Sequence, residues 1–354
     1  MSSPQELSKT TLRIIDANSN RIGESLRLLE DIARLLLNDA GLSSRLKATR
    51  HQLSVKDMRT KKQLLQSRDS RNDVGADIEV AQQDKERELP ATIIANARRT
   101  QEAMRVIEEL AKIPGINIDS EKFKKARFEM YDIERELVSR ILRRDKTVRI
   151  TGLYAIIDTQ YLGKRRCQDI TLEVLKGGAG IVQLRSKEAP ENRLLADARN
   201  MKNLCSEYDA LFIMNDYLDI ALAADADGLH IGQGDMPVRD ARRLLPIDKI
   251  IGCSVDNKEQ AKAAEADGAD YIAFGAVYPT GSKDDIDVVG LAALKEIRKT
   301  TELPLVAIGG INADNAAEAI TAGADAVAVI SAIMQADSPE EATRQIINRL
   351  ETQN

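Results

Sequence analysis

The feature that most limits how this chain can fold is a series of short apolar runs, beginning near Arg149. Each run is too short for a helix and ends in turn-forming or polar residues, which is typical of a fully buried strand. Helical or loop segments separate the runs, so the pattern predicts βαβ units and a parallel sheet. Eight strands in an α/β arrangement predict a (β/α)₈ TIM barrel, with a doubly wound sheet as the alternative. The runs are LYAIID from Leu153, IVQLR from Ile181, LFIMND from Leu211, GLHIG from Gly228, IIGCS from Ile250, YIAFGAV from Tyr271, LVAIGG from Leu305 and AVAVIS from Ala326.

Two carboxylates follow neighbouring strands of this predicted sheet. Asn215 and Asp216 end the third strand, and Gln233 and Asp235 lie just past the fourth. The carboxyl ends of parallel strands meet at one edge, so we expect Asp216 and Asp235 to converge. Carboxylates that close repel one another unless a cation lies between them, and Mg²⁺ prefers oxygen ligands. The alternative is that one carboxylate caps a helix and the other belongs to a turn.

Two anion sites are expected at the same strand ends, where the active site of a (β/α)₈ barrel lies. The first carries enough positive charge, together with Mg²⁺, to suit a pyrophosphate. The second suits a phosphate monoester held by backbone N–H groups. Such a pair predicts a transferase that joins two substrates and releases pyrophosphate without a Ser–His or Cys–His nucleophile. The first site would contain Arg185, Lys187 and Lys283, and the second Gly309, Gly310 and Ser331; Gln183, Ser254, Thr280, Ser282 and Ile330 lie at the same strand ends, whereas His230 lies within a strand and is expected to be a hydrogen-bonded barrel residue.

Residues 1–147 carry almost no strand signal and are expected to form an all-α domain ahead of a barrel over 148–354. Apolar residues at helical intervals predict helices over Thr10–Asn38, Ser43–Gln66 and Ser120–Arg144, with a polar loop over Ser67–Glu79. An internal repeat supplies a further helix. NSNRIGESLRLLEDIAR from Asn18 matches NARRTQEAMRVIEELAK from Asn96, an offset of 78 residues (96 − 18), and KATRHQL from Lys47 loosely matches KKARFEM from Lys124. The repeated unit is therefore a helix pair, which predicts a four-helix arrangement.

The repeat preserves charged residues spaced three apart, which form a stripe along one helix face. One interpretation is a solvated face with Arg–Glu pairs. The other is that two such stripes line a cleft that binds phosphate or ATP through the planar fork of arginine. The matched residues are Arg21, Glu24, Arg27 and Glu30 in the first copy and Arg99, Glu102, Arg105 and Glu108 in the second.

Composition narrows the class of protein. At 354 residues the chain exceeds the size at which single cores usually stop growing, so two domains are expected. A net charge of −5 and the absence of Trp argue against a nucleic-acid or membrane partner, which leaves small-molecule substrates and, as an open question, a homo-oligomer. Cys167, Cys205 and Cys253 show neither metal-site nor disulfide spacing, which fits a reducing compartment. With no apolar N-terminal segment, we expect a cytoplasmic protein.

Taken together, several segments between residues 150 and 350 resemble the thiamine-phosphate synthase family: IVQLRSK, FIMNDYLDIA, GLHIGQGDMP, IGCSV, FGAVYPTGSK and VAIGGI. That family joins hydroxymethylpyrimidine pyrophosphate to thiazole phosphate, giving thiamine phosphate and pyrophosphate. The resemblance implies that Asp216 and Asp235 carry one Mg²⁺. It also implies that Arg185, Lys187, Ser254 and Lys283 are catalytic. Substrate contacts would come from these four and from Gln183, Asn215, Thr280, Ser282, Gly309, Gly310, Ile330 and Ser331; the family commonly has threonine where this chain has Ser282, which keeps the hydroxyl.

The first part of the chain resembles a small domain found fused ahead of this synthase, through RIIDANSNRIGESLRLLEDIAR, RDSRNDVGADI and NARRTQEAMRVIEELA. That domain phosphorylates hydroxymethylpyrimidine phosphate to the pyrophosphate, so the resemblance implies ATP as a substrate. The chain has no G-x-x-x-x-G-K-[ST] loop, so ATP binding would differ from that of a P-loop enzyme. The alternative for this part is a non-catalytic dimerisation or regulatory module. For the barrel it is a thiazole tautomerase, an isomerase that would need neither the metal pair nor the basic cluster.

Overall fold

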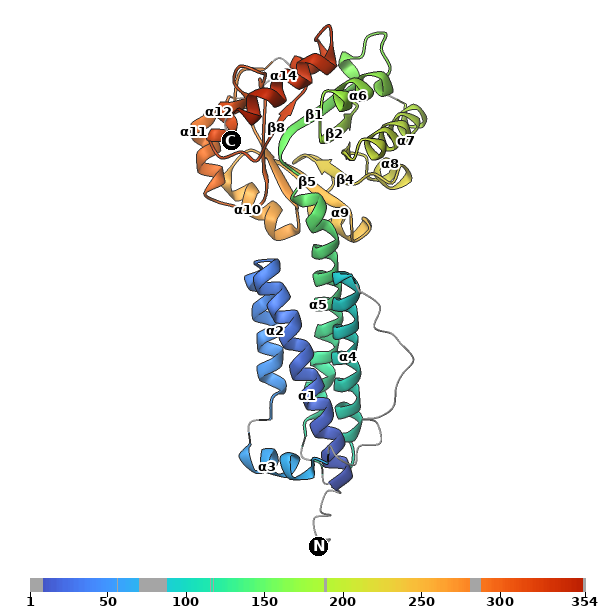
Figure 1. Ribbon diagram of the computed structural model, residues 1–354, viewed down its shortest axis with the longest axis vertical. Helices are drawn as coiled ribbons and strands as arrows, with labels where there is room; N and C mark the ends of the chain where they lie inside the picture. Colours follow the sequence, from blue (N-terminus) through green and yellow to red (C-terminus); the bar gives the residue numbers. More distant parts are fainter. Residues whose placement is uncertain are drawn as a thin grey trace. The chain divides into compact units, whose positions relative to one another are not determined.

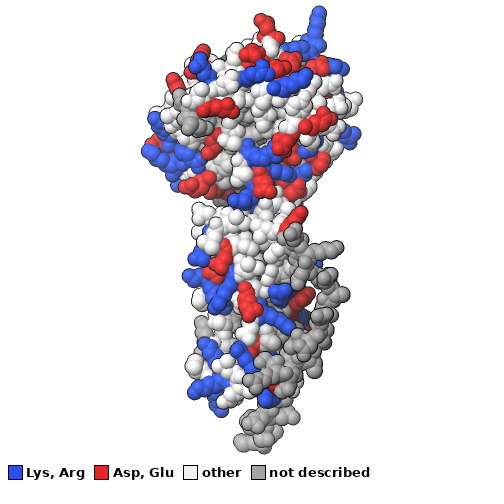
Figure 2. Space-filling view, in the orientation of Figure 1, with Lys and Arg blue, Asp and Glu red and all other residues white. Residues whose placement is uncertain are grey.

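The computed structural model describes residues 9–55, 57–69, 88–114, 116, 118–187, 190–280 and 288–352 (Figure 1). The chain divides into two compact units, residues 1–142 and 143–354, whereas we expected a boundary between Thr147 and Val148. In the described part of the chain no helix is both long and apolar enough to span a bilayer. Basic and acidic side chains are interspersed on the face drawn in Figure 2.

The first unit is all-α over its described residues, as the sequence predicts. The two helices that carry the repeat pack directly on one another. Leu26 and Leu29 of the first copy, and the matching Met104 and Ile107 of the second, are almost completely buried, so the repeated apolar spacing builds this core. The elements are α1 (Lys9–Asp31), the π-helical segment η1 (Ile32–Leu36), α2 (Ala40–Leu53), α3 (Met58–Ser67), α4 (Leu89–Leu110) and α5 (Ser120–Thr147), of which the last residues belong to the second unit.

The single helix expected over Ser43–Gln66 is wrong, because the chain forms α2 and α3 with a break between them. Ser54 leaves the helix in an extended conformation, and its hydroxyl donates to the carbonyl oxygen of His51 at 2.9 Å. The carboxylate of Asp57 then accepts from the N–H of Thr60 at 2.7 Å and caps α3. Short polar side chains compete for backbone groups in this way, and apolar periodicity does not reveal it. The expected loop over Ser67–Glu79 lies outside the described residues from Ser70 onward.

The matched glutamates of the repeat form equivalent ion pairs. Arg50 Nη2 lies 2.9 Å from Glu30 Oε2, and Arg127 Nη2 lies 3.1 Å from Glu108 Oε2. The pair joins α1 to α2 in one copy and α4 to α5 in the other. Each of the four side chains is at most a quarter exposed, so these pairs are screened less than surface pairs. The duplication therefore preserves a tie between the two helices of each repeated unit.

The second unit is a closed barrel of eight parallel strands in sequence order, which confirms the predicted (β/α)₈ fold. The doubly wound alternative is wrong, because β8 pairs with β1. The strands are β1 (Gly152–Asp158), β2 (Ile181–Arg185), β3 (Leu211–Asn215), β4 (Gly228–Ile231), β5 (Ile250–Val255), β6 (Tyr271–Phe274), β7 (Leu305–Ile308) and β8 (Ala326–Val329).

Helices follow the strands and cover the outside of the barrel (Figure 1). Along β2, Val182 and Leu184 pack outward against the helices, while Ile181 packs inside the barrel. Gln183 and Arg185 alternate with the outward residues and so share the inner side with Ile181, as the period-two pattern predicts. The helical elements are η2 (Thr159–Tyr161), α6 (Cys167–Lys176), α7 (Glu191–Glu207), α8 (Leu218–Ala223), α9 (Val238–Leu244), α10 (Lys258–Asp267), α11 (Gly290–Arg298), α12 (Ala316–Thr321), α13 (Ser331–Met334) and α14 (Pro339–Glu351).

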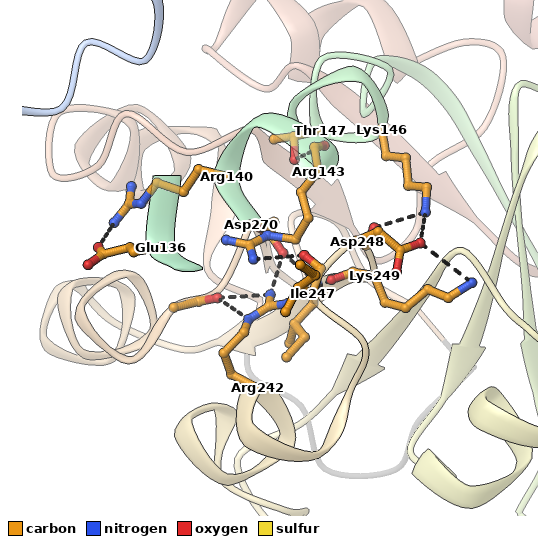
Figure 3. Close-up of polar contacts among 12 residues, drawn as sticks. Glu136, Arg140, Arg143, Lys146, Thr147, Arg242, Ile247, Asp248, Lys249 and Asp270 are labelled. Atoms are coloured by element: carbon orange, nitrogen blue, oxygen red, sulfur yellow. Dashed lines mark hydrogen bonds and ion pairs between the residues drawn. The ribbon is translucent and has the colours of Figure 1, made fainter. Parts of the chain in front are cut away.

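The second unit begins with the last turn of α5, which is bonded to the loops that enter two strands (Figure 3). Arg143 Nε donates to Asp270 Oδ1 at 2.8 Å, and Lys146 Nζ donates to Asp248 Oδ2 at 3.1 Å. Asp270 also accepts from Arg242. These aspartates precede β6 and β5, at the amino ends of the strands, the end of a (β/α)₈ barrel that serves stability rather than catalysis.

Candidate active site at the mouth of the barrel

A cavity of about 140 Å³ lies at the carboxyl ends of β5 to β8. Thr280, Gly310 and Ser331 also line an adjacent hollow of about 450 Å³, so they face both spaces. The strand order therefore brings together those residues expected to bind the phosphate monoester that the structure describes. Six expected residues line the cavity: Ser254, Thr280, Gly309, Gly310, Ile330 and Ser331.

Gly309 and Gly310 shape this cavity through their backbone. Their φ angles are 98° and 65°, in the left-handed region that glycine adopts without strain. A Cβ atom on Gly309 would lie 2.5 Å from the Cα of Ala276, and one on Gly310 would lie 2.4 Å from the carbonyl oxygen of Pro279. Both positions therefore require glycine, and the strand end remains open to a ligand.

Arg185 is held at the other side of the mouth by a residue that the sequence analysis missed. Its guanidinium donates to the carboxylate of Asp158, the facing residue of β1 in the sheet register. Asp158 is fully buried and also accepts from the N–H of Gln160 at 3.0 Å. The signal was present, since Asp158 is a strand-end carboxylate like Asp216, but only the closed sheet identifies its partner.

Asp216 and Asp235 interact with one another, as expected of strand ends that converge, and both are accessible at the mouth. Asp216 has a φ of 63°, a conformation uncommon outside glycine and often found at functional sites. Its N–H donates to the carbonyl oxygen of His230 at 2.8 Å. Asp235 Oδ2 accepts from the N–H of Gly232 at 2.7 Å. Each carboxylate is therefore oriented by the backbone next to it.

Burial and neighbouring groups shift the pKa of Asp216. Partial burial of the carboxyl raises its pKa to about 6, and a hydrogen bond and the charge of Asp235 act in the same direction. The charge of Arg185 and a hydrogen bond from Asn215 lower the pKa. Arg185, Asp216 and Asp235 thus lie within electrostatic reach of one another, at the ends of β2, β3 and β4.

The paired carboxylates suit a hard divalent cation by the chemistry of their donors. Both offer oxygen ligands, and a cation between them would relieve the repulsion that adds to the effect of burial on the pKa of Asp216. Among the described residues no group of three or more His, Cys, Asp or Glu side chains could hold a metal. A cation held by two carboxylates would have further positions for water and for ligand oxygens, a pattern common for Mg²⁺.

A chain of buried hydrogen bonds crosses the barrel beneath the mouth. Gln183 Nε2 donates to the hydroxyl of Tyr154 at 2.8 Å, which lies 2.9 Å from the hydroxyl of Tyr271. His230 Nδ1 lies 3.1 Å from that second hydroxyl, and His230 Nε2 lies 2.9 Å from Ser254 Oγ. His230 is thus bonded at both ring nitrogens, as expected of a barrel residue. The sequence pattern did not reveal that Tyr154 and Tyr271 take part in this chain of hydrogen bonds. Nor did it reveal the contact between His230 and the expected site residue Ser254.

Four barrel candidates remain, of which the structure describes Asn215 and Lys187. Asn215 is buried at the end of β3, and Lys187 is exposed just after β2. Ser282 and Lys283 lie in the segment 281–287, outside the described residues. Their expected contacts with pyrophosphate and phosphate therefore stay predictions.

The six charged candidates of the helical unit are all exposed. Arg105 lies 2.8 Å from Glu108 and 2.6 Å from Glu109 on its own helix, which favours the solvated-face interpretation there. Arg27 differs, because it lines a cavity of the helical unit. The others are Arg21, Glu24, Arg99 and Glu102.

Two family models match the chain. One, described as thiamine monophosphate synthase, matches residues 153–333. These residues include all eight strands of the barrel except the first residue of β1. The other, described as the ThiD2 family, matches residues 13–136 of the helical unit.

Similar proteins span both units. A thiamine-phosphate synthase of Nostoc punctiforme is 36% identical over 349 residues, which is 99% of this chain and 97% of the relative. One of Thermosynechococcus vestitus is 38% identical over 96% of this chain and 94% of its own length. Among solved structures, a thiamine phosphate pyrophosphorylase from Pyrococcus furiosus is 40% identical with a TM-score of 0.54, over 58% of this chain and 98% of its own.

Proposed function

The chain belongs to the thiamine-phosphate synthase family, and from that premise we propose which residues at the mouth of its barrel hold each substrate. One substrate is hydroxymethylpyrimidine pyrophosphate and the other is thiazole phosphate. The observation that carries the assignment is the pairing of two unlike anion sites on one rim. Arg185 and the two carboxylates lie at the ends of β2 to β4, and the glycine-lined cavity lies at the ends of β5 to β8.

On the charged side, Arg185 binds the pyrophosphate in an orientation that Asp158 holds from behind. Asp216 and Asp235 would hold Mg²⁺, which supplies positive charge to the departing pyrophosphate. Lys187 and Lys283 would add further positive charge. In the reaction the bond between the pyrimidine methylene carbon and the pyrophosphate oxygen breaks, and a bond from that carbon to the thiazole nitrogen forms. The protein contributes orientation and electrostatic stabilisation rather than a nucleophile.

On the other side, the backbone at Gly309 and Gly310 and the hydroxyls of Thr280 and Ser331 bind the thiazole phosphate. Ser254 and Gln183 contact the pyrimidine, and the buried hydrogen-bond chain fixes their rotamers. Both substrates are thereby brought to one cavity in a defined orientation. A thiazole tautomerase, which releases no pyrophosphate, gives no reason for the carboxylate pair or for Arg185.

For the helical unit we propose phosphorylation of hydroxymethylpyrimidine phosphate by ATP. The match to the ThiD2 family over residues 13–136 supports this, as do relatives that share both units. The competing proposal is a non-catalytic dimerisation or regulatory module. Homo-oligomerisation and a cytoplasmic location stay predictions.

Two parallel reactions test the activities proposed for the two units. The purified full chain is given hydroxymethylpyrimidine phosphate, ATP, Mg²⁺ and thiazole phosphate, and thiamine phosphate is measured. A parallel reaction supplies hydroxymethylpyrimidine pyrophosphate without ATP. Product in both reactions supports both activities, and product only in the second supports the synthase with a non-catalytic helical unit. No product in either would overturn the assignment for the barrel.

A further inference from the structure

The helical unit contains a cavity of about 430 Å³ to which no ligand has been assigned above. Its walls come from the middle of α1, the end of α2, the first turns of α3 and the start of α5. Apolar side chains form part of the wall, and hydroxyl, amide and basic groups form the rest. The lining residues are Ser19, Asn20, Ile22, Gly23, Arg27, Arg50, His51, Leu53, Ser54, Val55, Lys61, Leu64 and Phe123.

The charged side chains that line this cavity are all basic. Arg50 is neutralised by its ion pair with Glu30. Within the described ranges, Arg27 and Lys61 have no side-chain hydrogen bond or ion pair, although both line the cavity. Two cations without a counter-charge, facing one hollow, favour an anionic occupant.

The carboxylate that Asn20 of the cavity wall contacts is already occupied. Asn20 Nδ2 donates to Asp16 Oδ2 at 3.4 Å, and the same carboxylate accepts from Arg68 Nε and Nη2. Asp16 therefore does not compensate Arg27 or Lys61. The excess positive charge of the cavity remains available to a ligand.

One glycine explains why the cavity exists in the first copy of the repeat. Gly23 lies in the middle of α1, and a Cβ atom there would meet nothing within 4 Å. With the offset of 78 residues, the matching residue of the second copy is Gln101 (23 + 78). Gln101 is buried and donates to Glu134 at 2.6 Å. The second copy thus fills this position, while the first leaves it open.

An unfilled glycine in a helix lowers helix stability relative to alanine, because glycine loses more backbone entropy on folding. No steric contact at Gly23 requires the missing side chain, since the space is open. The cost is explained if the space must be left for a ligand. The apolar wall, which includes Ile22, Leu64 and Phe123, offers a surface for a ring next to the cationic side chains.

We propose that this cavity binds a small phosphorylated heteroaromatic compound, with the phosphate on Arg27 and Lys61 and the ring on the apolar wall. The identification with the pocket of the phosphorylation reaction rests on the proposed function of the helical unit. In that case the occupant is hydroxymethylpyrimidine phosphate or ATP. Of the charged residues that match between the two copies of the repeat, the inference assigns only Arg27 to the site. It adds Lys61 and Gly23, which are not among those matched charged residues.

The first experiment measures turnover of hydroxymethylpyrimidine phosphate with ATP by the full chain. Arg27→Ala and Lys61→Ala are expected to raise the KM of one substrate roughly 10-fold or more, since each loses a charge-assisted contact to phosphate. Arg34→Ala and Lys62→Ala are the matched controls. Arg34 is exposed on η1 and Lys62 is exposed on α3, and neither lines the cavity. Synthase activity with the pyrophosphate supplied is the folding control for all four variants.

Gly23→Gln provides a second variant, which places in the first copy the side chain that the second copy carries. It should abolish turnover by filling the cavity, while the thermal midpoint of the helical unit is unchanged or raised. Lost turnover with a lowered midpoint would instead indicate misfolding, and the Arg27 and Lys61 variants then decide. Retained turnover in Gly23→Gln, Arg27→Ala and Lys61→Ala together overturns the cavity as the site, whatever the activity of the unit.

The second experiment separates binding from catalysis. The chain contains no Trp, so Phe123→Trp places its one tryptophan in the cavity wall, where it is excited selectively over the seven tyrosines. Hydroxymethylpyrimidine phosphate, a non-hydrolysable ATP analogue and inorganic phosphate are titrated separately. A saturable response that Arg27→Ala and Lys61→Ala weaken, and that Arg34→Ala and Lys62→Ala do not, supports the cavity even if no phosphorylation occurs. Calorimetry on the unmodified chain with the same three probes controls for the substitution in the wall. If neither chain binds any of the three probes, the proposal fails.

Discussion

Arg143 Nε lies 2.8 Å from Asp270 Oδ1, and both side chains are about nine-tenths buried. Asp270 also accepts from the N–H of Ile251 at 2.8 Å and from Arg242. The last turn of α5 is therefore part of the hydrogen bonding at the amino ends of β5 and β6. Because an unpaired buried charge is costly, this contact has a measurable role in the stability of the barrel.

We predict that Arg143→Ala destabilises the barrel by about 1–3 kcal/mol, less than for a fully orphaned charge because Arg242 still contacts Asp270. Arg144→Ala, next to it and exposed, should stay within about 0.5 kcal/mol. The measurement is loss of synthase activity with increasing urea. Equal midpoints for the two variants would contradict a stabilising role for the pair.

The same contact bears on how the chain can be divided. A truncated chain that begins at Ser139 keeps one helical turn before Arg143, and we expect it to fold and make thiamine phosphate from the two phosphorylated substrates. One that begins at Val148, the boundary expected from sequence, lacks Arg143 and should lose activity at a lower temperature. If both are insoluble while the full chain is active, the barrel is not an independent folding unit.

Asp158 is predicted to act as a positioning residue for Arg185. Asp158→Asn keeps the shape of the side chain but removes the charge that orients the guanidinium. We expect kcat/KM for the pyrimidine pyrophosphate to fall roughly 10- to 100-fold, with the KM for thiazole phosphate unchanged. Asp169→Asn, which alters an exposed aspartate paired with Arg166, is the control. A loss shared equally by both substrates would indicate a general structural defect.

Metal dependence tests the carboxylate pair. Asp216→Ala or Asp235→Ala should lower kcat by roughly 10²-fold or more, because the departing pyrophosphate loses preorganised charge stabilisation. EDTA should abolish activity of the unmodified chain, and added Mg²⁺ should restore it. Asp219→Ala, an exposed aspartate in the first turn of α8, should behave like the unmodified chain. Full activity in EDTA would remove the metal from the mechanism.

The ion pairs of the repeat predict which of its glutamates are structural. Glu108→Ala leaves Arg127, which is only 12% exposed, without its carboxylate, and should destabilise the helical unit by about 2–4 kcal/mol. Glu102→Ala, at the exposed position of the same helix, should change stability by less than about 0.5 kcal/mol. Hydrogen exchange in α4 distinguishes the two variants. Similar protection in both would contradict a stabilising role for the ion pair of Glu108.

The amino-acid sequence by itself determined the order of elements and the edge of the barrel that holds the chemistry. Eight apolar runs with turn residues between them leave few ways to bury every strand, and their carboxyl ends must then share one rim. The period of two placed Gln183 and Arg185 on one side, and strand ends identified Asp216, Asp235, Gly309 and Gly310. Periodicity is a local property, so it predicts which side of an element a residue occupies.

Only the tertiary structure decided which side chains meet, because their partners are far apart in sequence. Closure of the sheet set the register that pairs Arg185 with Asp158 and brings Tyr154 to Tyr271. In the helical unit, the repeat pattern gave equal weight to Arg27 and Arg105. The packing of α1 with α2, α3 and α5 leaves an open space beside Gly23, whereas Gln101 is buried at the matching position. Whether a charged residue lines a cavity or faces solvent depends on the helices packed around it. The spacing of residues along one helix does not predict where those neighbouring helices lie.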